Sequence, residues 1–239
     1  MRREFVWSDA DAARVVDSRT REEYMNNVAG SGLNEFYGSA EQLRAYHARF
    51  LNYAIAAPAE FPILDLGCGT GVFLELARER GRAGRGVECA AEAVQLARAK
   101  GLDVVEADAL EFLRGQAAAS HGAIYCAHLI EHLAPPDARA LLTEAARVLT
   151  MQGRLIVLTP NPVSLDVISE TFWLDPTHVR PYPRPLLERM MQRAGLEILA
   201  SGHDNPPGLP RRALPRRLFL RIVLGKHYGA MNTFVVGRK

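Results

Sequence analysis

Three histidines lie in two short polar stretches whose side chains could accept a proton. His128 and His132 belong to AHLIEHL, together with Glu131, and His178 follows Asp175 in DPTHVRPYP. Histidine changes charge near neutral pH, so its neutral ring can take a proton from a reacting hydroxyl group. We expect His178 or His128 to be that base and favour His178, because Asp175 could orient its ring and raise its basicity.

The same residues raise the question of a metal site. His128, Glu131 and His132 have the His-x-x-Glu-His spacing of the inverted zinc-protease motif, which needs a continuous helix and a further carboxylate ligand. Here the residues leave a predicted strand, so we expect no metal. Glu131 and His132 then anchor the loops that follow or take part in catalysis, and divalent-metal binding is a third interpretation.

The stretch from 175 to 183 carries Asp, Thr, His, Arg and Tyr at a density that packing alone does not require. Its prolines stiffen the chain and limit the entropy lost when a ligand binds. One interpretation is the wall of a substrate site, supplied by His178, Arg180 and Tyr182, in which Arg180 would suit a phosphate or carboxylate. The other is a well-packed solvated loop.

A glycine-rich turn in ILDLGCGTGVFLEL offers a second kind of chemistry. Asp65 precedes three alternating glycines, Gly67, Gly69 and Gly71, so a ligand can lie directly on the backbone. Dinucleotide sites have the order Gly-x-Gly-x-x-Gly, whose third glycine would stand here at Val72. The turn alone therefore does not identify its ligand.

Two acids end the next predicted strands. Glu88 stands 21 residues after Gly67, where a carboxylate can accept hydrogen bonds from both ribose hydroxyls of NAD or S-adenosylmethionine. Asp108 ends the following strand, where it could accept from an adenine amino group. Each alone could be a surface acid, but their joint placement after consecutive strands favours a nucleoside site.

These residues need elements that bring them to one edge of a sheet. Short apolar runs alternate with helical patterns from about residue 61. Strands are expected at 61–67, 84–88, 102–108, 122–128 and 153–160, and helices at 71–80, 90–100, 109–115 and 135–149. This alternation predicts an α/β, Rossmann-like fold, with a doubly wound, mainly parallel sheet covered by helices on both faces. The strand ends, and hence the site, fall on one edge.

The two ends of the chain lack this alternation of strand and helix patterns. A helical pattern covers 39–56, and the chain after residue 159 is first polar and rich in proline, then predicts a helix at 184–195 and strands at 196–202 and 230–239. We expect one domain over 1–239. Its parts are a helical lid or extension at 1–60, a cofactor-binding core at 61–160, and a substrate-side loop with the last helix and strands at 161–239.

Composition limits the function classes. The chain has 239 residues, 48% hydrophobic and 23% charged, as in ordinary globular proteins. It has no apolar run of about 18 residues and no signal-peptide core at its start, so we expect no transmembrane helix and a cytoplasmic location. Cys68, Cys89 and Cys126 have neither disulfide nor zinc spacing, and we interpret them as packing residues.

Charge is uneven along the chain. Residues 201–239 hold eight Lys or Arg and one acid, although the net charge is only +2. Because this charge is confined to one terminal stretch and is not spread over a broad face with interleaved aromatics, we expect no nucleic-acid partner. The basic segment at 211–226 is either an amphipathic cover over the sheet edge or site, or a contact with anionic membrane surfaces.

Taken together, these motifs resemble the class I S-adenosylmethionine-dependent methyltransferases. The carriers are residues 65–71, Glu88, Asp108, AHLIEHL, and RVLTMQGRLIVLTPNP, which has MQG where PGG is usual. The resemblance covers roughly residues 35–200 and implies a seven-stranded sheet and S-adenosylmethionine as cofactor. The residues that it implies for cofactor binding are Asp65, Gly67, Cys68, Gly69, Gly71, Glu88, Cys89, Asp108, Ala109, Ala127 and His128.

Within that class, roles follow from position. Asp65 would orient the amino group of the methionine part, Glu88 would hold the ribose, and Asp108 would bind the adenine. Cys89 and Ala109 would flank the adenine ring. Ala127 and His128 would lie near the sulfonium.

A narrower resemblance concerns the acceptor. NEFYGSAEQLRAYHARFLNY, IEHL, TPNP and FWLDPTHVRPYP are similar to methyltransferases associated with O-antigen and other polysaccharide synthesis. The sequence departs from them at GTGVF, where GRGEF is usual, and at Glu88, where Asp is usual. The substrate residues expected on this basis are Tyr37, Glu131, His132, His178, Arg180 and Tyr182.

The expected function is O-methylation of a saccharide or saccharide-like small molecule. A nitrogen or phosphate acceptor on a natural product or lipid-linked glycan is the alternative within enzymes. From other classes, the rivals are a nicotinamide-dependent oxidoreductase, disfavoured by Val72 and Asp108, and a non-catalytic cofactor-binding module, disfavoured by the dense polar loop. The sequence leaves the methylated atom and the oligomeric state open.

Overall fold

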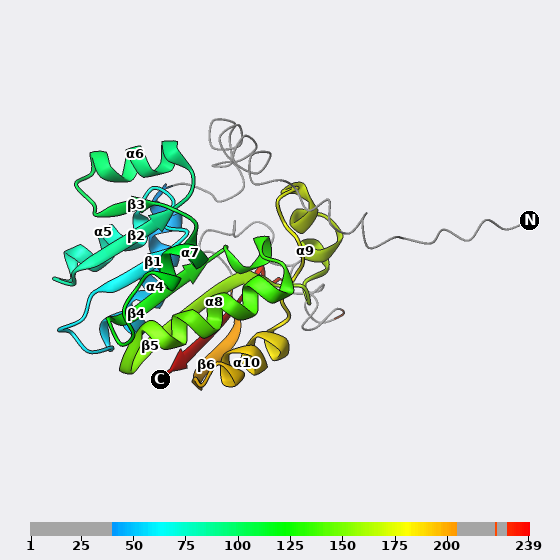
Figure 1. Ribbon diagram of the computed structural model, residues 1–239. Helices are drawn as coiled ribbons and strands as arrows, with labels where there is room; N and C mark the ends of the chain where they lie inside the picture. Colours follow the sequence, from blue (N-terminus) through cyan, green and yellow to red (C-terminus); the bar gives the residue numbers. More distant parts are fainter. Residues whose placement is uncertain (1–39, 205–222, 224–228) are drawn as a thin grey trace, which may run out of the picture.

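The computed structural model describes residues 40–204, 223 and 229–239 (Figure 1). The predicted substrate residue Tyr37 and the basic segment 211–226, apart from Val223, lie outside the described residues. Within the described residues, no helix combines the length and the apolar character needed to cross a bilayer.

One seven-stranded sheet organises the molecule, in the order β3-β2-β1-β4-β5-β7-β6. Neighbouring strands are parallel except β7, which runs antiparallel to both β5 and β6. The predicted fold class is confirmed. The strands are β1 (Ile63–Leu66), β2 (Gly84–Glu88), β3 (Val104–Glu106), β4 (His121–Ala127), β5 (Leu149–Pro160), β6 (Glu197–Asp204) and β7 (Asn232–Arg238).

Helices cover both faces of this sheet, and Figure 1 shows α8 and α10 in front of it. They are α4 (Ala40–Ile55), α5 (Val72–Glu79), α6 (Ala91–Ala99), α7 (Ala109–Arg114), α8 (Pro135–Val148), α9 (Leu165–Ser169) and α10 (Arg184–Arg193). Two short 3-10 helices, η1 (Ile130–His132) and η2 (Thr171–Leu174), follow β4 and α9. Pro135 begins α8, where its missing N–H costs no hydrogen bond.

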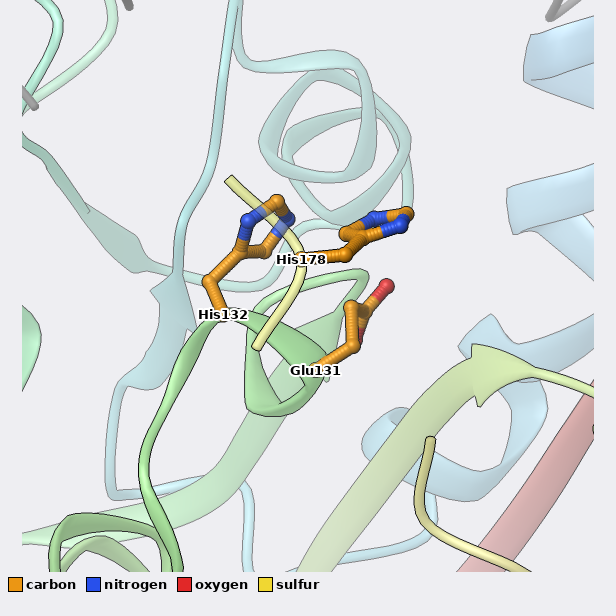
Figure 2. Close-up of side chains that lie close together, drawn as sticks. All are labelled: Glu131, His132 and His178. Atoms are coloured by element: carbon orange, nitrogen blue, oxygen red, sulfur yellow. The ribbon is translucent and has the colours of Figure 1, made fainter. Parts of the chain in front are cut away.

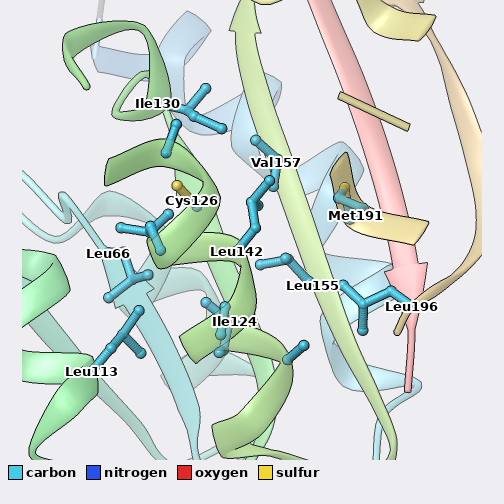
Figure 3. Close-up of a cluster of buried hydrophobic side chains, with 14 of the residues drawn as sticks. Leu66, Leu113, Ile124, Cys126, Ile130, Leu142, Leu155, Val157, Met191 and Leu196 are labelled. Carbon is cyan, nitrogen blue, oxygen red and sulfur yellow. The ribbon is translucent and has the colours of Figure 1, made fainter. Parts of the chain in front are cut away.

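Successive side chains along each strand point to opposite faces of the sheet, so the hydrophobic core has one part on each face. On β4, Ala123 and Tyr125 pack with α4 and α5, whereas Ile124 and Cys126 pack with α7, α8 and α10. The second cluster is the larger one (Figure 3). Successive side chains of a strand point to opposite faces, so a strand buried on both sides is apolar throughout.

Strand order also decides where a ligand can bind. From β1 the chain moves outward to β2 and β3, and then returns to the other side of β1 with β4 and β5. In doubly wound sheets the crevice lies at this reversal, outside the carboxyl ends of the strands. The glycine turn after β1 and the His128 stretch after β4 therefore face the same crevice.

β5 differs from its predicted bounds. It begins at Leu149, four residues before the expected strand at 153–160, and its pairing with β4 is irregular between His121 and Ala123. Gln152 has a φ of 64°, within this irregular stretch. The sequence does not show the first four residues of β5 as strand, because this irregularity interrupts the alternation of buried and exposed side chains.

Candidate active site

The glycine turn leaves open space above its backbone at Gly69. Gly67, Gly69 and Gly71 have φ values of 70°, 52° and 83°, a region that side chains with a Cβ rarely adopt. Apart from the chain neighbours of Gly69, no atom of the described residues lies within 4 Å of the position that a Cβ on Gly69 would take. A ligand can therefore approach the backbone at Gly69 directly, as the sequence predicts.

Glu88 braces this turn from the end of β2. Its Oε2 accepts a hydrogen bond from the Gly69 N–H at 2.9 Å, and its Oε1 accepts from the N–H groups of Cys89 at 2.8 Å and Ala90 at 2.9 Å. The carboxylate is thus fixed beside the turn, and its role toward a ribose stays a prediction.

Asp65 places a buried carboxyl at the same point. Burial raises its pKa well above the usual range, and the charge of Glu88 raises it further. Asp65 forms no ion pair with any described residue. A cationic amino group bound here would offset the cost of ionising this carboxyl, so the site fits the methionine part of S-adenosylmethionine.

Asp108 has a structural task that the sequence analysis did not assign. Its Oδ1 accepts from the N–H groups of Leu110 at 2.8 Å and Glu111 at 3.0 Å, which makes Asp108 the N-cap of α7. Asp108, like Glu88, Cys89 and Ala109, belongs to the β2 and β3 ends and does not line the cavity described next. Its contact with adenine stays a prediction.

A cavity of about 430 Å³ opens beside the glycine turn. Gly67 and Gly69 bound it on one side, and Ala127 and His128 bound it at the end of β4. Its remaining walls come from α4, α5, the ends of β4 and β5, the segment from α9 to His178, and the start of β7, and many of their side chains are apolar. The apolar side chains are Leu43, Val72, Phe73, Tyr125, Pro160, Val167, Phe172, Leu174 and Met231.

His128 and Glu131 form a hydrogen-bonded pair at the cavity wall. His128 Nδ1 lies 3.3 Å from Glu131 Oε1, and Glu131 Oε2 accepts from the Thr159 hydroxyl at 3.0 Å. Burial alone would raise the pKa of the fully buried Glu131, but its hydrogen bond with His128 and the charges of His128 and His132 hold that pKa below its usual value. A carboxylate can only accept, so His128 Nδ1 donates to Glu131, and Nε2 is the atom through which the ring can exchange a proton with a ligand.

His178 also lines the cavity, but Asp175 does not hold its ring. His178 Nδ1 lies 2.6 Å from the Phe172 carbonyl oxygen, whereas His178 Nε2 lies 3.9 Å from Asp175 Oδ2. Asp175 Oδ1 instead accepts from the Thr177 hydroxyl at 2.6 Å. A carbonyl oxygen only accepts, so His178 Nδ1 donates to it.

Glu131, His132 and His178 converge from η1 and the chain after η2 (Figure 2). Each offers one ligand atom, and these atoms lie within 4.8 Å of one another, so this is the set among the described residues that could hold a divalent metal. The Glu131 oxygens already accept from His128 and Thr159. The expectation of no metal stays a prediction.

The same cluster anchors the polar stretch. The Glu131 carbonyl oxygen accepts from the N–H groups of Val179 at 2.8 Å and Arg180 at 3.3 Å. His132 Nδ1 lies 2.7 Å from Thr177 Oγ1. Because the Thr177 hydroxyl donates to Asp175, it accepts from His132 Nδ1. These contacts support the interpretation that Glu131 and His132 position the following loop.

Arg180 and Tyr182 lie at the base of that loop, outside the cavity lining. The buried Tyr182 hydroxyl donates to the Leu133 carbonyl at 2.8 Å, and the Arg180 guanidinium lies 5.3 Å from the centre of the Tyr182 ring. The expected contacts of these two side chains with substrate stay predictions, and their positions support a structural role instead.

Sequence reasoning missed the polar residues on α4 and β7. Tyr46, His47 and Asn232 all line the cavity, and His47 Nδ1 lies 2.7 Å from the Tyr125 hydroxyl. Tyr46 falls on the apolar face predicted for its helix, so the sequence pattern alone does not show that its hydroxyl faces a cavity. Asn232 begins a strand far along the chain, and only the sheet order brings it here.

Comparisons with known proteins agree with this geometry. A family described as "Methyltransferase domain" matches residues 39–201. The ubiquinone biosynthesis O-methyltransferase of Idiomarina loihiensis is 32% identical over 104 residues, which are 41% of this chain and 42% of that protein. The protein of the same name from Xanthomonas axonopodis pv. citri is 28% identical over 178 residues, 67% of this chain and 74% of that protein.

Solved structures show the same fold. A SAM-dependent methyltransferase from Archaeoglobus fulgidus superposes with a TM-score of 0.74 at 23% identity, covering 86% of this chain and 97% of that one. Geranyl diphosphate C-methyltransferase from Streptomyces coelicolor has a TM-score of 0.63 at 17% identity, covering 81% and 77%. The chain therefore belongs to the methyltransferase domain family, among the class I S-adenosylmethionine-dependent methyltransferases.

Proposed function

We propose that this protein transfers a methyl group from S-adenosylmethionine to a hydroxyl group of a small molecule. The observation that carries the proposal is the His128–Glu131 pair, in which His128 lines the cavity one strand away from the glycine turn and the buried Glu131 holds its ring. A hydroxyl acceptor has to lose a proton during the transfer, and an imidazole whose Nδ1 donates to a carboxylate can take that proton at Nε2 when the ring is neutral.

The cofactor would be held by residues already in place. Gly67 and Gly69 would receive it on their backbone, Asp65 would pair with its amino group, and Glu88 and Asp108 would bind the ribose and adenine. Bound there, S-adenosylmethionine supplies an activated methyl group on a sulfonium. The protein then has to align the acceptor and exclude water.

The geometry moves our preference for the base from His178 to His128. Glu131 is a buried carboxylate that fixes the tautomer and orientation of the His128 ring, whereas a neutral backbone carbonyl holds His178. A carboxylate also stabilises the imidazolium that forms when the ring accepts a proton. His178 faces the same cavity and would position the acceptor hydroxyl.

The acceptor is a saccharide or saccharide-like molecule if the resemblance to polysaccharide-associated methyltransferases extends to the substrate. A phenolic hydroxyl is the second candidate, because Phe73, Tyr125 and Phe172 make the cavity walls aromatic. The relatives named ubiquinone biosynthesis O-methyltransferase are also O-methyltransferases. Among the described residues, the cavity lining includes no Lys or Arg, which disfavours a phosphate acceptor.

The test is methyl transfer from radiolabelled S-adenosylmethionine to a panel of glycosides and substituted phenols. We expect His128→Ala to lower turnover by about 10²–10⁴, the usual contribution of a general base. His121→Asn, at the opposite end of β4, is the matched control and should keep normal turnover. Unchanged turnover of His128→Ala at every pH would remove the base assignment, and no transfer to any hydroxyl compound would remove the proposal.

A further inference from the structure

The Tyr46 hydroxyl is a buried polar group without a well-formed hydrogen bond. Tyr46 is 3% exposed, its hydroxyl has no partner with good hydrogen-bond geometry among the described residues, and its side chain lines the cavity. Leaving a buried hydroxyl unsatisfied costs stability, so such a group in a cavity wall points to something that binds there. The mechanism proposed above does not use it.

A second polar side chain lies beside it. Asn232, at the start of β7, is 9% exposed and lines the same cavity, and its side-chain contact with the Tyr46 hydroxyl lowers the pKa of that hydroxyl, although the contact lacks good hydrogen-bond geometry. An amide offers both a donor and an acceptor. The two side chains therefore provide two donors and one acceptor within one corner of the cavity.

The charges around this corner favour a neutral ligand group. Burial, reinforced by the Asp204 carboxylate, raises the pKa of the Tyr46 hydroxyl, so it stays protonated and can donate. Arg49 is engaged by Asp204, with 2.7 Å between Arg49 Nη2 and Asp204 Oδ1. The carboxylates of Asp204 and Glu131 would repel an anion, whereas a carbonyl, ether or hydroxyl oxygen meets no such penalty.

Sheet order places the corner away from the reacting centre. Asn232 pairs with Pro160 of β5, and β5 separates β7 from β4, where His128 lies. Two strand spacings of about 4.8 Å separate them by roughly 10 Å. This span corresponds to the length of two linked six-membered rings.

We propose that Tyr46 and Asn232 form a distal subsite that binds a neutral oxygen of the methyl acceptor, about 10 Å from the hydroxyl that is methylated. The inference rests on the proposed function for the placement of the reacting hydroxyl. The subsite selects acceptors with a second oxygen at that distance. It serves a two-ring phenol and a disaccharide equally well.

Calorimetry in the presence of S-adenosylhomocysteine tests the subsite without requiring turnover. The probes are 4,4′-dihydroxybiphenyl, with an oxygen at each end, and 4-hydroxybiphenyl, which lacks the second one. We expect the first to bind at least fivefold more tightly to the wild-type protein. Tyr46→Phe should remove that difference and leave the affinity for S-adenosylhomocysteine within twofold, and Tyr53→Phe on the same helix should change neither.

Stability gives an independent readout. Because the hydroxyl has no partner with good hydrogen-bond geometry in the ligand-free fold, Tyr46→Phe should have a melting temperature equal to or above that of the wild type. A lower melting temperature would show that the hydroxyl serves the fold and would overturn the subsite. Equal affinities of the two probes, or an equal loss of S-adenosylhomocysteine affinity in Tyr46→Phe, would also overturn it. None of these results bears on the His128 assignment.

Discussion

The single most informative backbone position is Gly69. Its positive φ would strain any other residue, but open space lies where a Cβ would be, so the ligand-free fold has room for alanine. We expect Gly69→Ala to cost about 1–2 kcal/mol of stability from the left-handed backbone. A methyl group there should also block the cofactor and weaken binding of S-adenosylhomocysteine by at least tenfold.

Gly81→Ala is the matched control, because Gly81 has a φ of 69° and likewise no atom within 4 Å of a Cβ. Gly81 follows α5 at the opposite edge of the sheet. Thermal unfolding and calorimetry on both variants should give similar losses of stability and a loss of affinity only for Gly69→Ala. Normal cofactor affinity in Gly69→Ala would place the ligand elsewhere.

His47 makes stability depend on pH. Burial, reinforced by the charge of His128, lowers its pKa from 6.5 to about 4. Between these two pKa values the unfolded chain binds more protons than the folded chain. The free energy of unfolding therefore has its full value above about pH 6.5 and falls as the pH drops toward 4. From the size of the shift, the loss could reach about 3 kcal/mol.

His47→Gln removes this titration while keeping a polar side chain beside the Tyr125 hydroxyl. The melting temperature of the variant should fall less steeply than that of the wild type between pH 6.5 and 4. Tyr125→Phe keeps the histidine and should retain the steep fall. Parallel curves for wild type and His47→Gln would show that another group causes the acid sensitivity.

At the scale of elements, α7 depends on one residue with two assigned tasks. Asp108 caps this helix, and we expect it also to bind adenine. Asp108→Ala should cost about 1 kcal/mol of stability through loss of the cap. Asp108→Asn keeps an oxygen for the cap but turns an amide donor toward the adenine amino group, so it should keep stability and weaken cofactor binding by about tenfold.

Chemical denaturation and calorimetry on the two variants separate these tasks. If Asp108→Asn binds S-adenosylhomocysteine normally, Asp108 serves only as the helix cap that its hydrogen bonds form.

The stretch from 175 to 183 likewise contains polar residues whose contacts belong to the fold, although the sequence predicts that they face substrate. Tyr182 and Arg180 contact Leu133 and each other, so their role toward substrate stays a prediction, and His178 alone among these three lines the cavity.

At the scale of the whole molecule, the division of the chain into a core at 61–160 and a substrate side at 161–239 does not correspond to two folding units. β7 lies between β5 and β6 and contributes Val235 and Val236 to opposite faces of the sheet. We therefore propose one cooperative domain. Removing residues 232–239 should abolish the cooperative thermal transition seen by circular dichroism, because β5 and β6 both lose their partner.

A variant that ends at residue 204 tests the alternative. If it unfolds cooperatively and binds S-adenosylhomocysteine with normal affinity, the cofactor core is autonomous and the last strand is an addition. The sheet order makes this unexpected, since β6 pairs only with β7 in the described sheet.

Local patterns in the sequence were enough to predict the strands and helices of the half of the fold in which we expect the cofactor to bind. The glycine turn, Glu88 and Asp108 each stand directly after a predicted strand, and parallel strands connected by right-handed crossovers bring such ends to one edge. Periodicity located the helices α5, α6, α7, α8 and α10 to within about two residues, since each buries one face against the sheet. All of these predictions depend on patterns among residues that are close together in the sequence.

The tertiary structure decided the acceptor half. Whether Asp175 or Phe172 holds His178, whether Glu131 pairs with His128, and whether Tyr46 meets Asn232 depend on contacts between segments that periodicity does not link. A hydroxyl or carboxylate has the same sequence signature whether it braces a loop or faces a cavity. Its partner decides the role, and the partner is chosen by the packing of α4, η1 and β7 around the crevice.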